Sequence, residues 1–269
     1  MSEQPRTPVL FVSHGSPLFA LNPGQTGPAL QQWASDQAPA DRIKGIVLIS
    51  PHWMTRGGVA VMSTPMPRTW HDFGGFPDAL YQLQYPAQGD PALADKVMDL
   101  LQTAGVPHAA DERRPYDHGC WVPLMHLYPQ ADVPVVQVSL PDGFSTADIY
   151  AVGQALAPLR EQGILLVASG SMTHNLYELR REDGPTEPYV VAFCGWVHDT
   201  LMQGDLASML DYRARAPHAK RAHPSDEHFL TIYFALGAAG WGLTHGPGPV
   251  YISREVQFRT ISMDAFSLH

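Results

Sequence analysis

The sequence predicts a single α/β domain, residues 1–269, with a central mixed, largely parallel sheet flanked by helices. Three observations carry this prediction. Apolar runs of strand length lack regular alternation with polar residues, which is typical of strands buried on both faces of a sheet. These runs alternate along the chain with helical patterns. With 45% hydrophobic and 16% charged residues, the chain also has the balance of a globular protein with a sizeable core.

Six runs are predicted to form strands: 9–13, 45–50, 59–62, 133–140, 164–168 and 250–253. Five stretches between them are predicted to form helices: 28–35, 91–104, 145–162, 188–203 and 225–239. Pro28, Pro91 and Pro188 fall near helix starts, where the N–H that proline lacks would have no partner in any case. The proline-rich segment 63–77 is long and irregular, which is typical of a functional loop or lid.

Several classes of protein are disfavoured by composition. A net charge of −9 without a basic cluster argues against nucleic acid or an anionic membrane as a partner. The two cysteines, Cys120 and Cys194, are far apart, so neither a disulfide framework nor a cysteine zinc site is expected. The N-terminus lacks the apolar core of a signal peptide, and no run of about 18 apolar residues is present. We therefore expect a cytoplasmic protein.

Histidine is unusually frequent, with 13 residues, and three of them share one context. His14, His52 and His174 each lie just past the end of a predicted core strand. In open α/β sheets, ligands bind beyond the carboxyl ends of the strands. If these strands are parallel neighbours, the three imidazoles converge there. Because imidazole suits zinc, iron and copper, the pattern predicts a shared metal or catalytic site.

A second cluster lies in "HAKRAHPSDEHFL", where the histidines are spaced by five: His218, His223 and His228. Five residues rotate a helix by about 140°, so these side chains cannot share one face. The better interpretation makes Ser225 or Asp226 a helix N-cap, with Glu227 and His228 in the first turn. One of those two side chains then faces the crevice. His218 and His223 are expected at the surface or supporting the site.

Other histidines and motifs add less. His118, in "YDHGCWVPL", precedes a short predicted helix at 121–128 and is either a structural loop residue or a substrate contact. His126 lies inside that helix and is expected to be a packing residue. The nucleophile-elbow, P-loop and dinucleotide-binding motifs are absent. Cys120 lies too close to His118 in sequence to form a productive thiol–imidazole pair.

Seven segments share their order and approximate spacing with a known family: "VSHGSP", "SPHW", "HDFGGFPDALYQLQYPAQGDP", "YDHGCWVPL", "VPVVQVSL", "ASGSMTHNL" and "AHPSDEHF". Together they resemble the DOPA-type extradiol ring-opening dioxygenases. That group belongs to the class III extradiol dioxygenases, with the β subunit of protocatechuate 4,5-dioxygenase. The resemblance extends from about residue 8 to residue 265. No single segment would establish it.

The resemblance implies a mononuclear metal at the strand ends, with His14 and His52 as ligands. It implies a third ligand from Glu227 or His228, and the DOPA-type pattern favours His228. His174 matches the acid–base catalyst of the class and, in the DOPA-type group, a further metal ligand. By the same resemblance, His118 contacts substrate or oxygen.

The implied activity is cleavage of a catechol ring, DOPA-like, by O2 to a semialdehyde. Fe(II) is the metal expected for activity, because a facial three-ligand site leaves positions open for catechol and oxygen. Zn(II) is a possible occupant without redox chemistry of its own. Trp70 and Phe73 of segment 63–77 would shape the pocket. Two alternatives remain open: a zinc-dependent hydrolase with His174 as base, and a Memo-like binding protein without activity.

Overall fold

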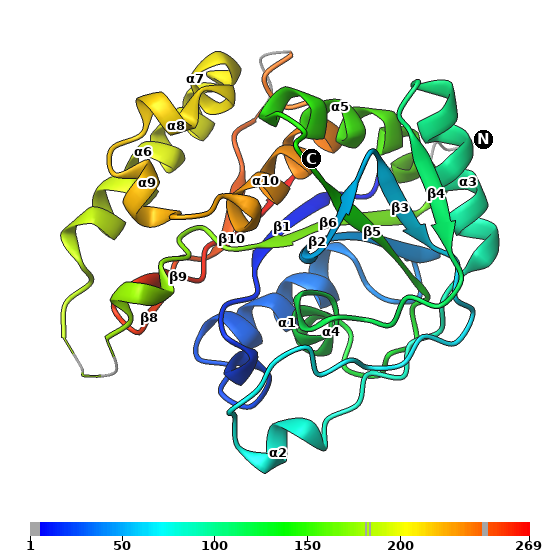
Figure 1. Ribbon diagram of the computed structural model, residues 1–269, viewed down its shortest axis with the longest axis horizontal. Helices are drawn as coiled ribbons and strands as arrows, with labels where there is room; N and C mark the ends of the chain where they lie inside the picture. Colours follow the sequence, from blue (N-terminus) through cyan, green and yellow to red (C-terminus); the bar gives the residue numbers. More distant parts are fainter. Residues whose placement is uncertain (1–5, 181, 183, 244–246) are drawn as a thin grey trace.

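The computed structural model describes residues 6–180, 182, 184–243 and 247–269. Eight strands form one sheet in the order β4-β3-β5-β2-β6-β1-β10-β7 (Figure 1). Their bounds are β1 (Val9–Ser13), β2 (Gly45–Arg56), β3 (Val59–Met62), β4 (His108–Asp111), β5 (Val135–Asp142), β6 (Ile164–Gly170), β7 (Val250–Ser253) and β10 (Ala265–Leu268). A second small sheet pairs β8 (Val256–Gln257) with β9 (Ile261–Ser262).

The middle of the large sheet is parallel. Strand β6 pairs in parallel with β1 on one side and with β2 on the other, and β2 pairs in parallel with β5. Antiparallel pairs appear toward both edges, at β3–β5, β1–β10 and β10–β7. The predicted mixed, largely parallel sheet is therefore confirmed.

Ten α-helices and three 3₁₀ helices are found in the described part of the chain. The α-helices are α1 (Thr26–Gln37), α2 (Asp78–Tyr81), α3 (Pro91–Thr103), α4 (His118–Leu127), α5 (Thr146–Leu156), α6 (Pro188–Gln203), α7 (Leu206–Leu210), α8 (Tyr212–Arg215), α9 (Ala219–Ala222) and α10 (Glu227–Ala239). The 3₁₀ helices are η1 (Pro17–Ala20), η2 (Ala157–Gln162) and η3 (Leu176–Glu178). None of the described helices is long and apolar enough to cross a membrane.

Both faces of the sheet are covered. Alternate residues of β1 belong to different apolar clusters: Val9 and Phe11 pack with α3, α5, α6 and α10, whereas Leu10 and Val12 pack with α1 and α4. Figure 1 shows α5 and α10 on one side of the sheet and α1 and α4 on the other. The non-alternating apolar runs in the sequence follow from this burial on both faces.

Most predicted elements are present, with shifted ends. The strands 9–13, 59–62 and 250–253 and the helix 188–203 have the predicted bounds. The strand predicted at 45–50 continues to Arg56, the one at 133–140 lies at Val135–Asp142, and the one at 164–168 continues to Gly170. The helix predicted at 145–162 ends at Leu156 and continues as η2. Strands β4 and β10 were not predicted, since β4 is short and half-exposed and β10 follows a polar turn.

Helices α5 and α10 approach so closely that their contact requires glycine. A Cβ at Gly237 would lie 1.9 Å from the Tyr150 carbonyl oxygen, and one at Gly153 would lie 2.1 Å from the Phe234 carbonyl oxygen. Both obstacles are backbone atoms, which cannot move aside as a side chain can.

A Gly237→Ala variant is therefore expected to lower the free energy of unfolding by about 3 kcal/mol, the upper part of the range for overpacked interiors. Gly195→Ala is the matched control, because Gly195 is inside helix α6 and its Cβ would meet nothing within 4 Å. That change should stabilise the protein by about 0.5 kcal/mol through helix propensity. Urea unfolding of both variants measures the difference, and equal stabilities would show that the α5–α10 contact tolerates a methyl group.

Candidate metal centre and active site

His14, His52 and His174 lie on or just after three neighbouring parallel strands, β1, β2 and β6. His14 directly follows β1, and its backbone N–H donates to the Gly170 carbonyl at the end of β6 (3.0 Å). His174 follows β6 by four residues. Strand β6 lies between β1 and β2 and pairs in parallel with both, so the three strands are the parallel neighbours that the prediction required.

His52 is positioned differently from the prediction. Strand β2 does not end before it: pairing with β5 passes from Ser50–Ser139 directly to Met54–Leu140, so the residues between Ser50 and Met54 form a bulge. His52 is the middle residue of that bulge. A bulge aims a side chain out of the regular pleat, and here it directs the His52 imidazole toward His14.

Two helix N-termini supply further side chains. The Asp117 carboxylate accepts from the Cys120 N–H and caps α4, so this helix begins at His118 rather than at the predicted residue 121. Glu227 and His228 open α10, as predicted, with Asp226 at the N-cap position but without a side-chain cap hydrogen bond.

A glycine brings α10 to the sheet edge. A Cβ at Gly170 would lie 2.3 Å from the His228 carbonyl oxygen, and that carbonyl accepts from the Ser171 N–H (2.9 Å). The first turn of α10 therefore touches the end of β6, which places the His228 imidazole beside the strand-end histidines.

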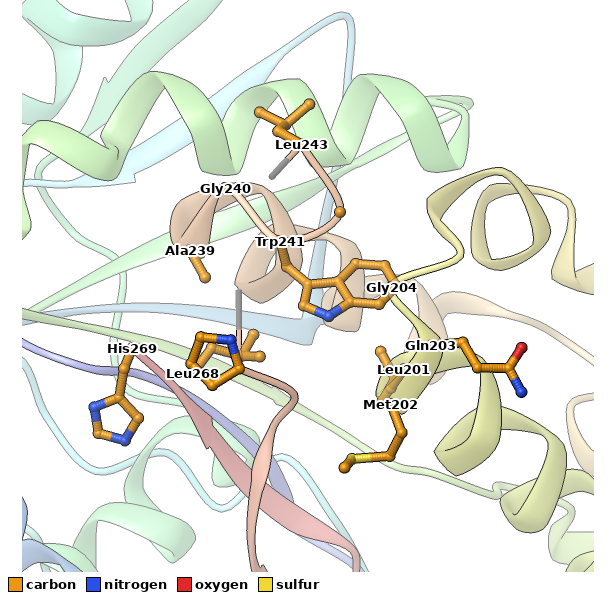
Figure 2. Close-up of a pocket in the computed structure, with 12 residues that line it drawn as sticks. Leu201, Met202, Gln203, Gly204, Ala239, Gly240, Trp241, Leu243, Leu268 and His269 are labelled. Carbon is orange, nitrogen blue, oxygen red and sulfur yellow. The ribbon is translucent and has the colours of Figure 1, made fainter. Parts of the chain in front are cut away.

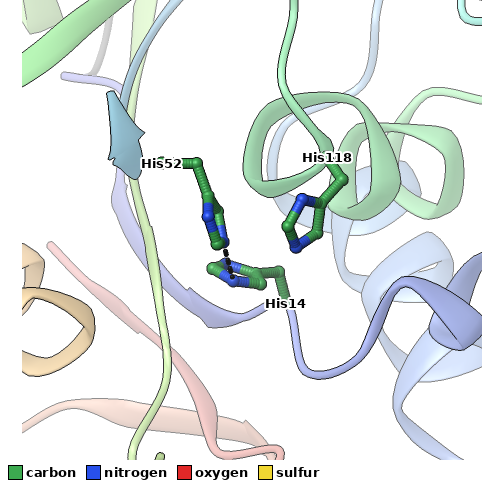
Figure 3. A group of neighbouring side chains, drawn as sticks. All are labelled: His14, His52 and His118. Carbon is green, nitrogen blue, oxygen red and sulfur yellow. Dashed lines mark hydrogen bonds between the residues drawn. The ribbon is translucent and has the colours of Figure 1, made fainter. Parts of the chain in front are cut away.

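The imidazoles of three histidines meet through their Nε2 atoms. His52 Nε2 lies 3.1 Å from His14 Nε2 and 3.3 Å from His228 Nε2. Figure 3 shows His14 at the end of its strand, His52 above it, and His118 beside them at the start of its helix. The rings of His52 and His118 are 3.9 Å apart between centroids.

Hydrogen bonds fix the tautomers of two of these rings. The Ser169 hydroxyl donates to the Gly119 carbonyl, so its oxygen accepts from His14 Nδ1–H (2.9 Å). Glu227 accepts from His228 Nδ1–H (2.8 Å). A neutral imidazole protonated at Nδ1 carries its lone pair on Nε2. His14 and His228 therefore both direct lone pairs toward His52 Nε2.

Burial keeps these imidazoles neutral. It lowers the pKa of His14 and His228 well below the ordinary value, and the neighbouring histidines lower both further. Burial, with the adjacent His118, lowers the pKa of His52 to about 3. At neutral pH no proton competes with a cation for these lone pairs.

The donor set suits a divalent metal. Metal–imidazole bonds of about 2.1 Å with angles near 90–110° separate neighbouring nitrogens by roughly 3.0–3.4 Å, and the two observed separations fall in this range. The second partners, Ser169 and Glu227, are of the kind that orient metal-bound histidines. His14, His52 and His118 form one group of possible ligands, and His174, Glu227 and His228 form a second, adjoining one.

His174 stacks on His228. Their ring centroids are 3.5 Å apart and the planes differ by 9°, so an ion in the plane of the His228 ring would lie outside the plane of the His174 ring. Burial lowers the pKa of His174 to about 4, although nearby Glu227 opposes the shift. Its ring nitrogens make no hydrogen bond to any residue in the described part of the chain.

A buried ion pair between Arg114 and Asp117 holds the backbone of His52 in place. Arg114 donates to Asp117 (2.7 Å) and to the His52 carbonyl (3.2 Å), and Asp117 also accepts from Ser50 (2.7 Å). A Cβ at Gly119 would lie 2.9 Å from a ring carbon of His52. This residue must therefore be small, since His52 packs against its backbone.

The remaining predicted residues fall in several places. His223 is fully buried and its Nε2–H donates to the Met172 carbonyl (2.9 Å), so it supports the segment leading to His174. His218 is exposed. His126 packs against Phe19 and donates to its carbonyl, as expected for a packing residue. Burial raises the pKa of the Cys120 thiol well above its ordinary value, which agrees with the rejection of a thiol nucleophile.

Sequence reasoning missed one prominent residue, Asp72. Its Oδ1 accepts from both the backbone N–H and Nδ1 of His118, each at 2.9 Å. Burial works to raise the pKa of Asp72, but the bonds from His118 outweigh it and hold the pKa below its ordinary value. Asp72 lies in the family-like segment "HDFGGFPDALYQLQYPAQGDP", but nothing in that segment assigned it a role.

A separate pocket of 340 Å³ lies at the other end of α10 (Figure 2). Ala239, Trp241 and the ends of α6 and β10 line it, and among the described lining residues His269 alone carries an imidazole. The length of α10 places this pocket about 18 Å from His228. It is not part of the histidine site.

Fold and site together define a class of protein. Residues 8–259 match the family described as the catalytic LigB subunit of aromatic ring-opening dioxygenase, and the chain belongs to this family. Among its relatives, the "4,5-DOPA dioxygenase extradiol" of Beta vulgaris is 38% identical over 86% of each chain. The protein of that name in Escherichia coli K12 is 38% identical over 96% of this chain and 93% of its own.

A solved structure agrees. The crystal structure of an uncharacterized protein from Escherichia coli K12 matches with a TM-score of 0.79 at 29% identity, covering 98% of this chain and all of that one. The resemblance seen in the sequence is thus confirmed at the level of family and fold. Membership of this family implies a small aromatic substrate and O2.

Proposed function

We propose that the protein is an extradiol dioxygenase that opens the ring of a DOPA-like catechol with O2 to give a semialdehyde. The observation that carries the proposal is the meeting of three Nε2 atoms from β1, β2 and α10 at one edge of the sheet. The relatives named 4,5-DOPA dioxygenase extradiol support the substrate class.

His14, His52 and His228 would hold the metal. Bound there, Fe(II) would allow electrons to pass between catechol and oxygen, as ring opening requires. Zn(II) has no redox chemistry and could not do so. Glu227 acts by orienting His228 through Nδ1 rather than as the third ligand. We assign His174 to proton transfer and not to the metal, because its ring lies parallel to that of His228.

The rest of the chain binds and orients the substrate. Phe73 of segment 63–77 meets the His118 ring edge to face, with centroids 5.6 Å apart, and gives the site an aromatic wall. His118 contacts the substrate from one side and His174 from the other. An imidazole at each position suits general acid–base chemistry at neutral pH.

The direct test is anaerobic reconstitution with Fe(II), followed by L-DOPA or a simpler catechol and then oxygen. We expect a yellow ring-fission product and stoichiometric oxygen uptake, with no product from the zinc-loaded protein. If a broad catechol panel remains uncleaved by iron-loaded protein, the proposal fails. Oxygen-independent hydrolysis by zinc-loaded protein would favour a hydrolase, and phosphopeptide binding without turnover would favour a binding protein.

A further inference from the structure

Asp72 is bound to the site by an unusual contact. It lies 46 positions before His118, yet one carboxylate oxygen accepts both the backbone N–H and Nδ1–H of that residue. The two side chains are only 8% and 9% exposed. The Asp72 carboxylate thus accepts from an N–H at the start of helix α4, although Asp117 already caps this helix. It also holds the side chain of His118, which lies beside the proposed metal ligands.

The position of Asp72 is fixed by its neighbours along the chain. Trp70 N–H donates to the Tyr116 carbonyl (2.8 Å), and Tyr116 N–H donates to the Arg68 carbonyl (2.9 Å). The Trp121 indole N–H donates to the Trp70 carbonyl (3.0 Å). Segment 63–77, expected to be a functional loop or lid, is therefore anchored beside the start of α4, and Asp72 is held in place before any substrate arrives.

The contact determines which nitrogen of His118 carries the proton. A carboxylate only accepts hydrogen bonds, so Nδ1 must be protonated and Nε2 carries the lone pair. The His118 ring lies beside those of His14 and His52 (Figure 3), and these three histidines form one group of possible ligands.

We propose that Asp72 is a positioning residue that makes His118 the acceptor of the first catechol proton. This inference rests on the proposed function. The substrate O–H bond breaks, its electron pair stays on the catechol oxygen, and the proton moves to His118 Nε2. Asp72 stabilises the imidazolium, and the proton returns to the product or to water when the cycle ends.

An Asp72→Asn variant of the iron-loaded protein tests the role. We expect kcat to fall on the order of 10- to 100-fold, with unchanged iron content and KM within about 3-fold, because the amide keeps the shape but does not enforce the tautomer. Asp78→Asn is the matched control, since Asp78 follows Asp72 closely in the sequence and its side chain is exposed. Turnover of Asp72→Asn within about twofold of the parent would overturn the proposal.

A double-mutant cycle separates positioning from a structural effect. If Asp72 acts through His118, adding Asp72→Asn to His118→Ala should slow the enzyme no further. Losses that multiply would show that Asp72 acts elsewhere and would overturn the proposal.

The tautomer of His118 can also be measured by spectroscopy, without any turnover of substrate. In the zinc-loaded parent protein, nitrogen-15 NMR should show His118 protonated at Nδ1 alone. A proton on Nε2 would overturn the inference. This measurement holds even if no catechol is cleaved, so failure of the proposed function and failure of the Asp72 inference give different results.

Discussion

A His52→Ala variant is expected to lose bound iron and ring-cleaving activity together. His52 Nε2 lies within 3.3 Å of the Nε2 atoms of both His14 and His228, so it is the nitrogen shared by the whole donor set. Without it, two nitrogens remain, too few for the facial site that Fe(II) requires. Metal content after reconstitution should fall from about one ion per chain to background.

The matched control is His198→Ala, in the middle of α6, where the side chain is 30% exposed and contacts Asp199. This variant should bind iron and turn over catechol like the parent. Full iron occupancy in His52→Ala would remove this residue from the ligand set and point to His118 as its replacement.

A His174→Ala variant is expected to keep its iron and lose most of its turnover. Stacking on His228 places its ring beside the metal ligands without directing its lone pair at the same point. Loss of a positioned acid or base lowers kcat by about 10²- to 10⁴-fold. Iron content and kcat, measured on the same preparation, give the result.

The opposite outcome is equally informative. If His174→Ala loses its iron, the histidine is a fourth ligand, as the resemblance to DOPA-type enzymes implied. If turnover is unchanged, His174 has no part in the mechanism. Both results would leave the roles of His14 and His52 untouched.

Much of the site was predictable because it follows from strand ends. His14 and His174 follow apolar runs that become neighbouring parallel strands, and such ends share one edge of a sheet. The choice between Glu227 and His228 stayed open in the sequence, because both lie in one helical turn. The geometry favours His228, whose Nε2 faces His52 while Glu227 bonds its other nitrogen.

Other parts of the site were not readable from local pattern. The bulge at His52 interrupts a strand that continues to Arg56. Pro51 is a signal for an irregularity at this point, but only the pairing with β5 shows that the strand resumes after it. Asp72 reaches His118 across 46 positions from a segment that has no periodicity. Helix α4 begins earlier than predicted because the cap by Asp117 depends on a buried network with Arg114 and Gln137. The β2–β5 pairing and the Asp72–His118 contact are long-range, whereas the Asp117 cap is local.

The distance along the chain between the proposed ligands has a consequence for biosynthesis. His14 and His52 are synthesised early, but His228 follows His52 by 176 positions and lies on the last α-helix of the described chain. A nascent chain therefore has at most two of the three imidazoles until the end of translation is near. If these three histidines hold the metal as proposed, its binding would be a late event and would join the first strand to the last α-helix of the described chain.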